Sequence, residues 1–391
     1  MHDGAVFYTI FLLFTGAAVL STLVLFTRQS LLVAYILLGA ILGPWGLALV
    51  SDLSAIQEVG DIGIVFLLFL LGLHLQPQNL VHMLKKVTWI ATLSSILFAL
   101  VAYGIGRWFG LTVTESWVLG ASMMFSSTII GLKLLPTTIL HHQHTGEVMI
   151  SVLLMQDIIA IVVLILINGS AQNLGHFNWH DLVSVCVTLP ALIFFSFAVE
   201  RYVLVRLLAR FDRTQEYVFL LSIGWCLSLS MLANRLGISE HIGAFVAGVA
   251  LASSPISLFI AESLKPLRDF FLVMFFFSVG ATFNFGFAAQ VIIPACILAF
   301  LMLVLKPLCF HLLFVKAGEK NSVAKEVGIR LGQASEFSLL VASIALSTKL
   351  ISDAASNLIQ ATTILTFIVS SYVVVLKYPT PMSLSDKMRK D

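Results

Sequence analysis

One carboxylate stands near the middle of a long apolar stretch, where a charged group has unusual chemistry. Asp157 lies within the run LLMQDIIAI, residues 153–161. Burying an ionised group away from water is costly, so such a group faces a cavity or a partner. A carboxylate can hold either a proton or a desolvated cation, and the two then compete for it. We interpret Asp157 as a proton- and ion-binding residue; the alternative is a carboxylate that only pairs two helices.

Gln156 stands directly before this carboxylate and is polar without being charged. Its amide oxygen could ligate a cation without adding charge to the site. The same amide could instead make a hydrogen bond between two helices. The sequence leaves both interpretations open.

A basic group occupies a similar position later in the chain. Lys306 lies in the run MLVLKPLCF, residues 302–310. A lysine in an apolar stretch needs a counter-ion, and Asp157 is the expected charge partner. The alternative is that the side chain reaches along its helix to the membrane surface. Lys316 marks that surface about 15 Å of helix away, which makes this extension strained.

Two short polar segments interrupt apolar helices, at residues 126–128 and 332–336. Unwound backbone at membrane depth is tolerated only where it lines a cavity, and its free carbonyls and dipole ends suit ions. We therefore predict two discontinuous helices. Ser126, Ser127 and Thr128 of the first segment are candidate ion-binding residues.

The second polar segment contributes Gln333, Ser335 and Glu336, which we predict to support its discontinuous helix. Glu336 is a second carboxylate in an apolar stretch. We favour a structural role for it, in which it neutralises helix-end dipoles or pairs with Arg330, over direct contact with an ion.

Metal or redox chemistry has weaker support. His141, His142 and His144 follow one another in a predicted loop, where a solvated segment is a better interpretation than a metal site. The four cysteines lie in apolar stretches without disulfide or metal spacing. We predict no metal and no cofactor.

The elements that position these residues must lie in a membrane. Of the 391 residues, 59% are hydrophobic and only 11% are charged, with a mean hydropathy of +1.02. A soluble domain carries about 25% charged residues. The formal net charge of +2 also provides no basic surface for nucleic acid. The sequence therefore predicts a multi-pass membrane protein, and we expect the bacterial inner membrane.

Apolar runs bounded by charges, Pro or Gly predict an all-α fold of about thirteen transmembrane helices. The first run is long enough to span and has no cleavage site, so it is interpreted as a helix rather than a signal peptide. The expected ranges are 5–26, 30–49, 57–75, 87–109, 114–132, 147–168, 182–200, 216–235, 239–254, 268–284, 289–315, 323–348 and 354–376.

The distribution of basic residues predicts the orientation of these helices. With the N-terminus outside, nearly all of the 22 Lys and Arg residues fall on the inner side. Only Arg107, Arg235 and Lys349 fall outside, and Lys306 remains within a helix. Cytoplasmic loops are enriched in Lys and Arg, so this arrangement, with a cytoplasmic C-terminus, is favoured.

The chain also contains an internal repeat. Gly72 and Gly280, and likewise Ser127 and Ser335, occupy similar local sequences 208 positions apart. Seven expected helices separate the equivalent elements. Because each helix reverses the direction of the chain across the membrane, an odd number places the second half in the inverted orientation relative to the first. Inverted repeats are typical of secondary transporters, with a site near the midplane. The predicted halves are residues 1–200 and 216–376.

Six short stretches follow one another along nearly the whole chain: Gly43–Leu47, Phe69–Leu73, Ser126–Thr128, Gln156–Asp157, Gly243–Gly248 and Ser335–Phe337. They resemble signature sequences of the monovalent cation:proton antiporter superfamily. The pair at 156–157 resembles the Gln-Asp pair of the Kef-type (glutathione-regulated) potassium/proton antiporters, whereas related sodium/proton antiporters usually carry Asp-Asp there.

The resemblance implies a fold and a set of roles. Asp157 is then the ion-binding carboxylate, Lys306 its basic partner, and the two discontinuous helices cross. The implied assembly is a homodimer of thirteen-helix protomers that works by an elevator motion. The implied substrates are K⁺ or Na⁺ and protons, and the lipid bilayer is the remaining partner.

The sequence departs from the full-length Kef pattern after the last expected helix. Residues 1–376 form the predicted exchanger domain, and 377–391 form a short cytoplasmic tail without a Gly-rich βαβ region. The nucleotide-binding regulatory domain is therefore expected to be missing, either naturally or by truncation. Exchange without control by glutathione is the corresponding expectation.

Exchange of K⁺ for protons is the favoured function, with Na⁺/H⁺ exchange as the nearest alternative. A gated potassium channel would need a continuous pore, which the inverted repeat and the lone carboxylate disfavour. An intramembrane aspartyl protease needs two carboxylates that share a proton. Only Glu336 could join Asp157 in that role, and the chain has no Gly-x-Gly-Asp motif, so we do not predict an enzyme.

Overall fold

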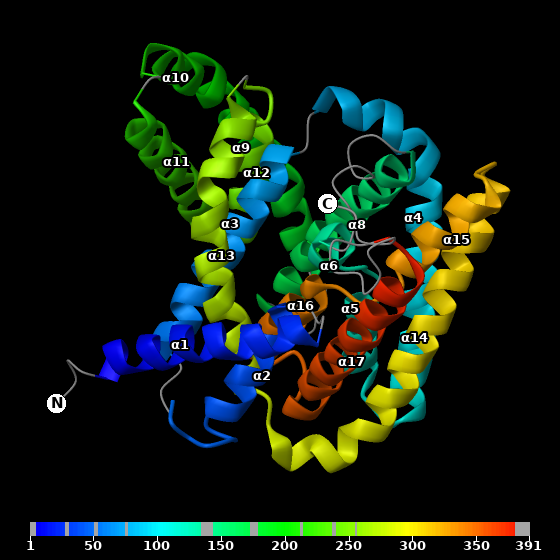
Figure 1. The fold of residues 1–391 in the computed structure, drawn as a ribbon. Helices are drawn as coiled ribbons and strands as arrows, with labels where there is room; N and C mark the ends of the chain where they lie inside the picture. The colour runs from blue at the N-terminus through cyan, green and yellow to red at the C-terminus, as the bar shows by residue number, and fades with distance from the viewer. Residues whose placement is uncertain are drawn as a thin grey trace. The chain divides into compact units, whose positions relative to one another are not determined.

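The computed structural model describes residues 5–27, 31–50, 54–74, 77–133, 144–172, 179–211, 214–236, 240–254 and 256–379. None of these described residues forms a β-strand, which agrees with the predicted all-α fold (Figure 1). The chain forms two compact units. Unit 1 contains residues 1–51, 83–174 and 279–391, and unit 2 contains residues 52–82 and 175–278.

Unit 1 holds most of the described helices and all of the candidate site residues. Within it, α16 packs against α5, α8 and α17, while α14 packs against α15 and α17. Its helices are α1 (Ala5–Phe26), α2 (Leu31–Leu42), α4 (Pro77–Trp108, from residue 83), α5 (Val113–Met123), α6 (Thr128–Lys133), α8 (His144–Gln172), η2 (Phe285–Phe287), α14 (Ala288–Lys316), α15 (Asn321–Arg330), α16 (Glu336–Ser347) and α17 (Asp353–Lys377).

Unit 2 is a smaller helical body built around the pairs α3–α12 and α11–α12. The α3–α12 contact is close because Gly248 faces Gly72: a Cβ built on Gly248 would lie 3.0 Å from the Gly72 Cα. The helices of unit 2 are α3 (Ser54–His74), α9 (Trp179–Val199), the π-helix η1 (Glu200–Leu204), α10 (Val205–Phe211), α11 (Gln215–Arg235), α12 (Glu240–Leu251) and α13 (Ser257–Ala281, to residue 278).

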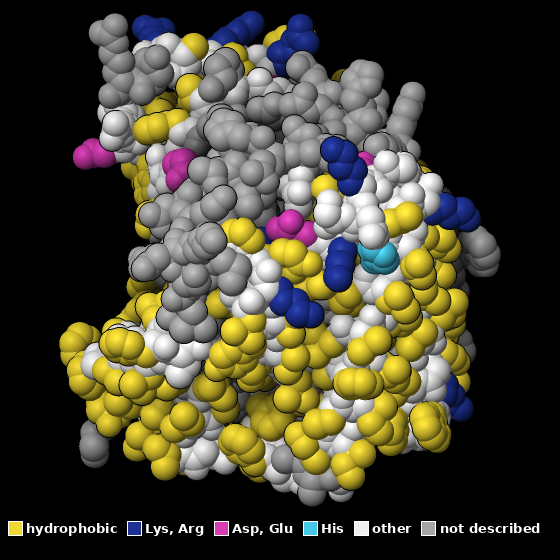
Figure 2. All heavy atoms as spheres, turned by 45° about the vertical axis from the view of Figure 1, so that its right-hand side comes forward, with side chains coloured by type: hydrophobic (Ala, Val, Ile, Leu, Met, Phe, Trp, Pro, Cys, Tyr) yellow, Lys and Arg dark blue, Asp and Glu magenta, His cyan; other side chains and the backbone are white. Residues whose placement is uncertain are grey.

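Each of the thirteen ranges expected from the sequence contains helix. Five described helices are long and apolar enough to cross a membrane by length and composition. They contain the segments Phe7–Phe26, Val87–Trp108, Gln215–Arg235, Gln290–Lys316 and Asp353–Lys377. Hydrophobic side chains cover much of the described surface in Figure 2.

Several boundaries differ from the expected ones. The second helix ends at Leu42 rather than residue 49, because Pro44 disfavours helical backbone at Gly43. The following turns include Ala48 with φ of +52°. The helix expected from residue 268 begins at Ser257 and contains Pro266. Residues 201–211, expected to be a loop, are helical.

Candidate functional site: two interrupted helices and a buried carboxylate

The two predicted interruptions are confirmed. The first separates α5, which ends at Met123, from α6, which begins at Thr128. The second separates α15, which ends at Arg330, from α16, which begins at Glu336. The starts of α5 and α15, and of α6 and α16, are both 208 positions apart, so the repeat seen in the sequence is repeated in the helix boundaries.

The two interruptions contact each other inside unit 1. Ser126 Oγ donates a hydrogen bond to the Leu331 carbonyl at 2.8 Å. Gln333 Nε2 donates to the Ser127 carbonyl at 3.4 Å. These bonds satisfy carbonyls that the interrupted helices leave open, so each break stabilises the other.

Gln156, on α8, forms hydrogen bonds with the backbone of the first break. Its side-chain oxygen accepts a hydrogen bond from the Ser126 backbone N–H at 3.0 Å. Its amide nitrogen donates to the Met124 carbonyl at 3.4 Å. Of the two interpretations left open by the sequence, this geometry corresponds to the bond between helices, because both ends of the amide hold the backbone of the break.

The second break is held by its own residues and by α17. Ser370 Oγ donates to the Gln333 side-chain oxygen at 2.9 Å, and the Ala334 N–H donates to Thr366 Oγ1 at 3.0 Å. Ser335 is the N-cap of α16, and its hydroxyl accepts from the Phe337 N–H at 3.1 Å. An N-cap of this kind satisfies one of the open N–H groups at a helix start.

Lys306 links the two breaks. Its side chain is 0% exposed, so it does not reach the membrane surface. Its ammonium group donates to the Phe125 carbonyl and, at 3.1 Å, to the Gln333 carbonyl. The ammonium also lies 5.3 Å from the centre of the Phe98 ring.

These contacts of Lys306 differ from the ion pair with Asp157 that the sequence suggested, which is not found among the contacts of the described residues. The physical reason is local. Phe125 and Gln333 follow the C-terminal ends of α5 and α15, where open carbonyls and the helix dipole are negative. A buried ammonium group carries three donors and is stabilised by these carbonyls.

Asp157 is 2% exposed and faces the start of α6. The Thr128 hydroxyl lies 3.5 Å from Asp157 Oδ1. Oδ2 is buried and has no hydrogen-bond partner among the described residues. Glu336, the first residue of α16, is close enough to interact electrostatically with Asp157. A buried carboxylate oxygen without a protein donor is stable when it carries a proton or binds a cation.

The hydroxyls of Ser126 and Ser127, predicted as ion-binding groups, are used within the breaks. Ser126 Oγ contacts Leu331, and Ser127 Oγ accepts from the Ile130 N–H at 3.0 Å. Arg330, the suggested partner of Glu336, forms an ion pair with Glu326 at 2.9 Å. Glu336 occupies the first turn of α16, where a negative charge suits the helix dipole.

The histidine cluster lies largely outside the described residues. His141 and His142 belong to the segment 134–143, and the side chain of His144 is likewise not described. Within the described part of the chain, no group of three or more His, Cys, Asp or Glu residues could hold a metal ion.

The contribution of α17 to the site was not predicted from the sequence. Ser356, Gln360, Thr363, Thr366 and Ser370 are all buried on this helix. Their spacing of three or four residues places them on one face, which is a readable signal in an otherwise apolar helix. A polar face on a buried helix predicts a partner with open hydrogen-bonding groups, and here Thr366 and Ser370 contact the second break.

A family model described as the transmembrane sodium/hydrogen exchanger matches residues 10–376, nearly the whole chain. The chain belongs to the sodium/hydrogen exchanger family. The chain is therefore a multi-pass membrane protein of the cation/proton antiporter class, whose members are transporters. This confirms the predicted superfamily.

The exchanger also resembles a solved structure, that of the sodium proton antiporter MjNhaP1 from Methanocaldococcus jannaschii. The TM-score is 0.69, and the match covers 95% of this chain and 98% of that chain. At 17% sequence identity, the likeness shows that the two exchangers share a fold. The closer resemblance to Kef-type systems stays a prediction.

Proposed function

We propose that the protein exchanges a monovalent cation for protons across the membrane, with Asp157 binding the cation and the proton in turn. The observation that carries the proposal is Asp157 Oδ2, a buried carboxylate oxygen without a hydrogen-bond partner among the described residues. One carboxylate that binds either ligand couples the two fluxes, because loading one ligand requires release of the other.

The neighbouring groups support this proposal in two different ways. Thr128 is the proposed second cation ligand, because its hydroxyl faces Asp157 Oδ1. Lys306 and Gln156 act on the backbone, where they hold the two breaks that shape the site. The proposed ligands are therefore Asp157 and Thr128, with Ser126, Ser127, Gln333, Ser335 and Glu336 as the supporting residues.

The identity of the cation has two candidates. K⁺ is supported by the resemblance of the Gln156–Asp157 pair to Kef-type antiporters. Na⁺ is supported at least as well by the family match and by the likeness to a sodium proton antiporter. Both ions would use the same carboxylate, so the two candidates differ in selectivity and share a mechanism.

The proposed orientation has the N-terminus outside and the C-terminus in the cytoplasm, following the distribution of Lys and Arg. The inverted repeat suits alternating access to the two sides of the membrane. We further propose a homodimer in the bacterial inner membrane that works by an elevator motion, as the resemblance implies.

Proton flux measured in proteoliposomes tests the proposed function. A pH-sensitive dye reports proton movement after addition of K⁺, Na⁺ or a large organic cation to the outside. We expect K⁺ or Na⁺, and not the organic cation, to drive proton movement, and the ion with the lower half-maximal concentration is the preferred substrate. Flux should fall at acidic pH, because protons then outcompete the cation at Asp157, and a higher cation concentration should restore it.

Asp157→Asn is the decisive variant, because Asn keeps the size of the side chain but does not titrate. The matched control is Asp269→Asn, which makes the same change at an exposed carboxylate paired with Arg268. Near-normal exchange by Asp157→Asn would remove this residue as the carrier. Cation flux that proceeds without proton movement would favour the channel alternative over exchange.

A further inference from the structure

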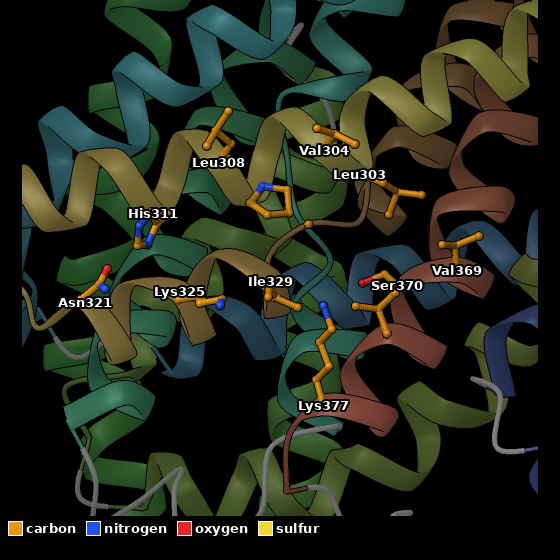
Figure 3. Close-up of a pocket in the computed structure, with 13 residues that line it drawn as sticks. Leu303, Val304, Leu308, His311, Asn321, Lys325, Ile329, Val369, Ser370 and Lys377 are labelled. Atoms are coloured by element: carbon orange, nitrogen blue, oxygen red, sulfur yellow. The ribbon is translucent and has the colours of Figure 1, made fainter.

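A pocket of about 480 Å³ lies within unit 1 between α14, α15 and α17, and Asp157 is not among its lining residues (Figure 3). Its size is in the usual range for small-molecule sites. Its lining is of two kinds, basic or polar on one side and aliphatic on the other. Such an amphipathic lining limits the kinds of molecule that could occupy it.

The polar side of the pocket is basic. Lys325 of α15 and Lys377 of α17 both extend into it, and His311 of α14 also lines it (Figure 3). His311 Nδ1 is buried and has no hydrogen-bond partner among the described residues. None of the described lining residues is acidic. The pocket therefore presents positive charge to an occupant without an internal counter-charge.

The aliphatic side of the pocket opens onto the outer surface of the helices. Val304 is 50% exposed, Leu308 52% and Val369 43%. These residues lie on α14 and α17, two helices that are long and apolar enough to cross a membrane. In a bilayer, such exposed aliphatic side chains face the acyl chains of lipid.

We propose that this pocket binds the headgroup of an anionic phospholipid. The phosphate would accept hydrogen bonds from Lys325 and Lys377, and the upper acyl chains would lie along Val304, Leu308 and Val369. Charge complementarity favours an anionic headgroup over a zwitterionic one, and basic pockets between transmembrane helices are suited to this task. A water-soluble anion would satisfy the lysines but leave the aliphatic wall without a partner.

The position of the pocket suggests a consequence for transport, which rests on the proposed function. Pro307 and Gly332 line the pocket, and they adjoin Lys306 and Gln333, which link the two breaks. Ser370, which bonds the Gln333 side chain, is also part of the lining. A lipid in the pocket therefore contacts the segments that support the second break, and we expect it to stabilise them.

Lipid retention measured by native mass spectrometry tests the binding. The full-length protein in detergent is mixed with phosphatidylglycerol or phosphatidylcholine, and the bound lipid is counted. We expect phosphatidylglycerol to be retained preferentially, and Lys325→Gln/Lys377→Gln to lose most of it. The control Lys316→Gln/Lys320→Gln removes the same charge from exposed lysines at the same end of α14 and α15 and should retain it.

A second variant tests the pocket without changing its charge. Leu308→Trp should fill the aliphatic side and reduce phosphatidylglycerol retention several-fold, with the helical circular dichroism preserved. Equal loss in the lysine variant and its control would contradict a specific pocket. Displacement of the lipid by inorganic phosphate alone would identify a free anion as the ligand and overturn the proposal, as would retention unchanged in all variants.

Exchange in vesicles of phosphatidylcholine, with and without phosphatidylglycerol, tests the coupling to transport. We expect phosphatidylglycerol to raise exchange several-fold in the wild type and the control, but not in Lys325→Gln/Lys377→Gln. Equal responses in all three would refute the coupling. Because retention is measured without transport, failure of the proposed exchange activity and failure of lipid binding remain distinguishable.

Discussion

The two interrupted helices have the same backbone plan but are stabilised by different chemistry. At the first break, Gln156 reaches in from α8 and makes two bonds to the backbone. The second break contains its own amide side chain, that of Gln333. Helix α17 contributes the hydroxyls of Thr366 and Ser370. The repeat therefore reproduces the helix boundaries without reproducing the contacts.

The carboxylates show the same asymmetry. Asp157 approaches the start of α6 from another helix, whereas Glu336 is itself the first residue of α16. Both positions place negative charge at the positive end of a half-helix. An asymmetric pair of this kind allows one carboxylate to stay as structural charge while the other exchanges its ligand. If the two carboxylates have these different roles, variants at the two breaks should differ in their effects on exchange and on stability.

The largest effect is expected from Lys306→Met, because Lys306 is the one described side chain that bonds backbone carbonyls of both breaks. Two buried carbonyls would lose a donor, at about 1–3 kcal/mol each. We expect a large fall in the melting temperature and loss of exchange. Lys316→Met, on the exposed end of the same helix, is the control; if it lowers the melting temperature as much, Lys306 does not hold the breaks.

The next comparison is between the two carboxylates. Asp157→Asn should abolish exchange with little change in melting temperature, because the side chain retains its size. Glu336→Gln should keep measurable exchange, because we assign the carrier role to Asp157 alone. Loss of exchange in both variants would mean that the two carboxylates act as one site, and the asymmetry between the breaks would not extend to function.

A smaller effect is expected from the two amides. Gln156→Leu and Gln333→Leu each remove side-chain bonds to a break, so each should lower the free energy of unfolding by about 1–3 kcal/mol. Because the breaks contact each other, the double variant should deviate from additivity by roughly 0.5 kcal/mol or more. Chemical denaturation of the single and double variants measures this, and strict additivity would show that the breaks are stabilised independently.

The smallest effect is expected from single hydroxyls. Thr128→Val should raise the half-maximal cation concentration about fivefold, which corresponds to the loss of an interaction of roughly 1 kcal/mol. Thr366→Val makes the same change at the second break and should lower the melting temperature while leaving that concentration unchanged. If Thr128→Val lowers the melting temperature but leaves the half-maximal cation concentration unchanged, Thr128 supports the backbone and is not a cation ligand.

The features that depend on local composition could be predicted from the amino-acid sequence alone. Apolar runs of sufficient length predicted helix over each of the thirteen ranges, and polar segments within such runs predicted both interruptions. The offset of 208 positions appeared in the residues and again in the helix starts. These predictions succeeded because helix formation and helix interruption follow from residues that are neighbours in the chain.

The group that each polar side chain contacts could be identified only in the folded chain. The sequence paired Lys306 with Asp157 because opposite charges attract, but the open carbonyls of Phe125 and Gln333 lie around the ammonium group. The hydrogen bond between Gln156 and the Ser126 N–H likewise depends on the position of the first break. The pocket formed by α14, α15 and α17 likewise had no counterpart in the sequence. Each of these contacts joins residues far apart in the chain, and their proximity is set by how the helices pack.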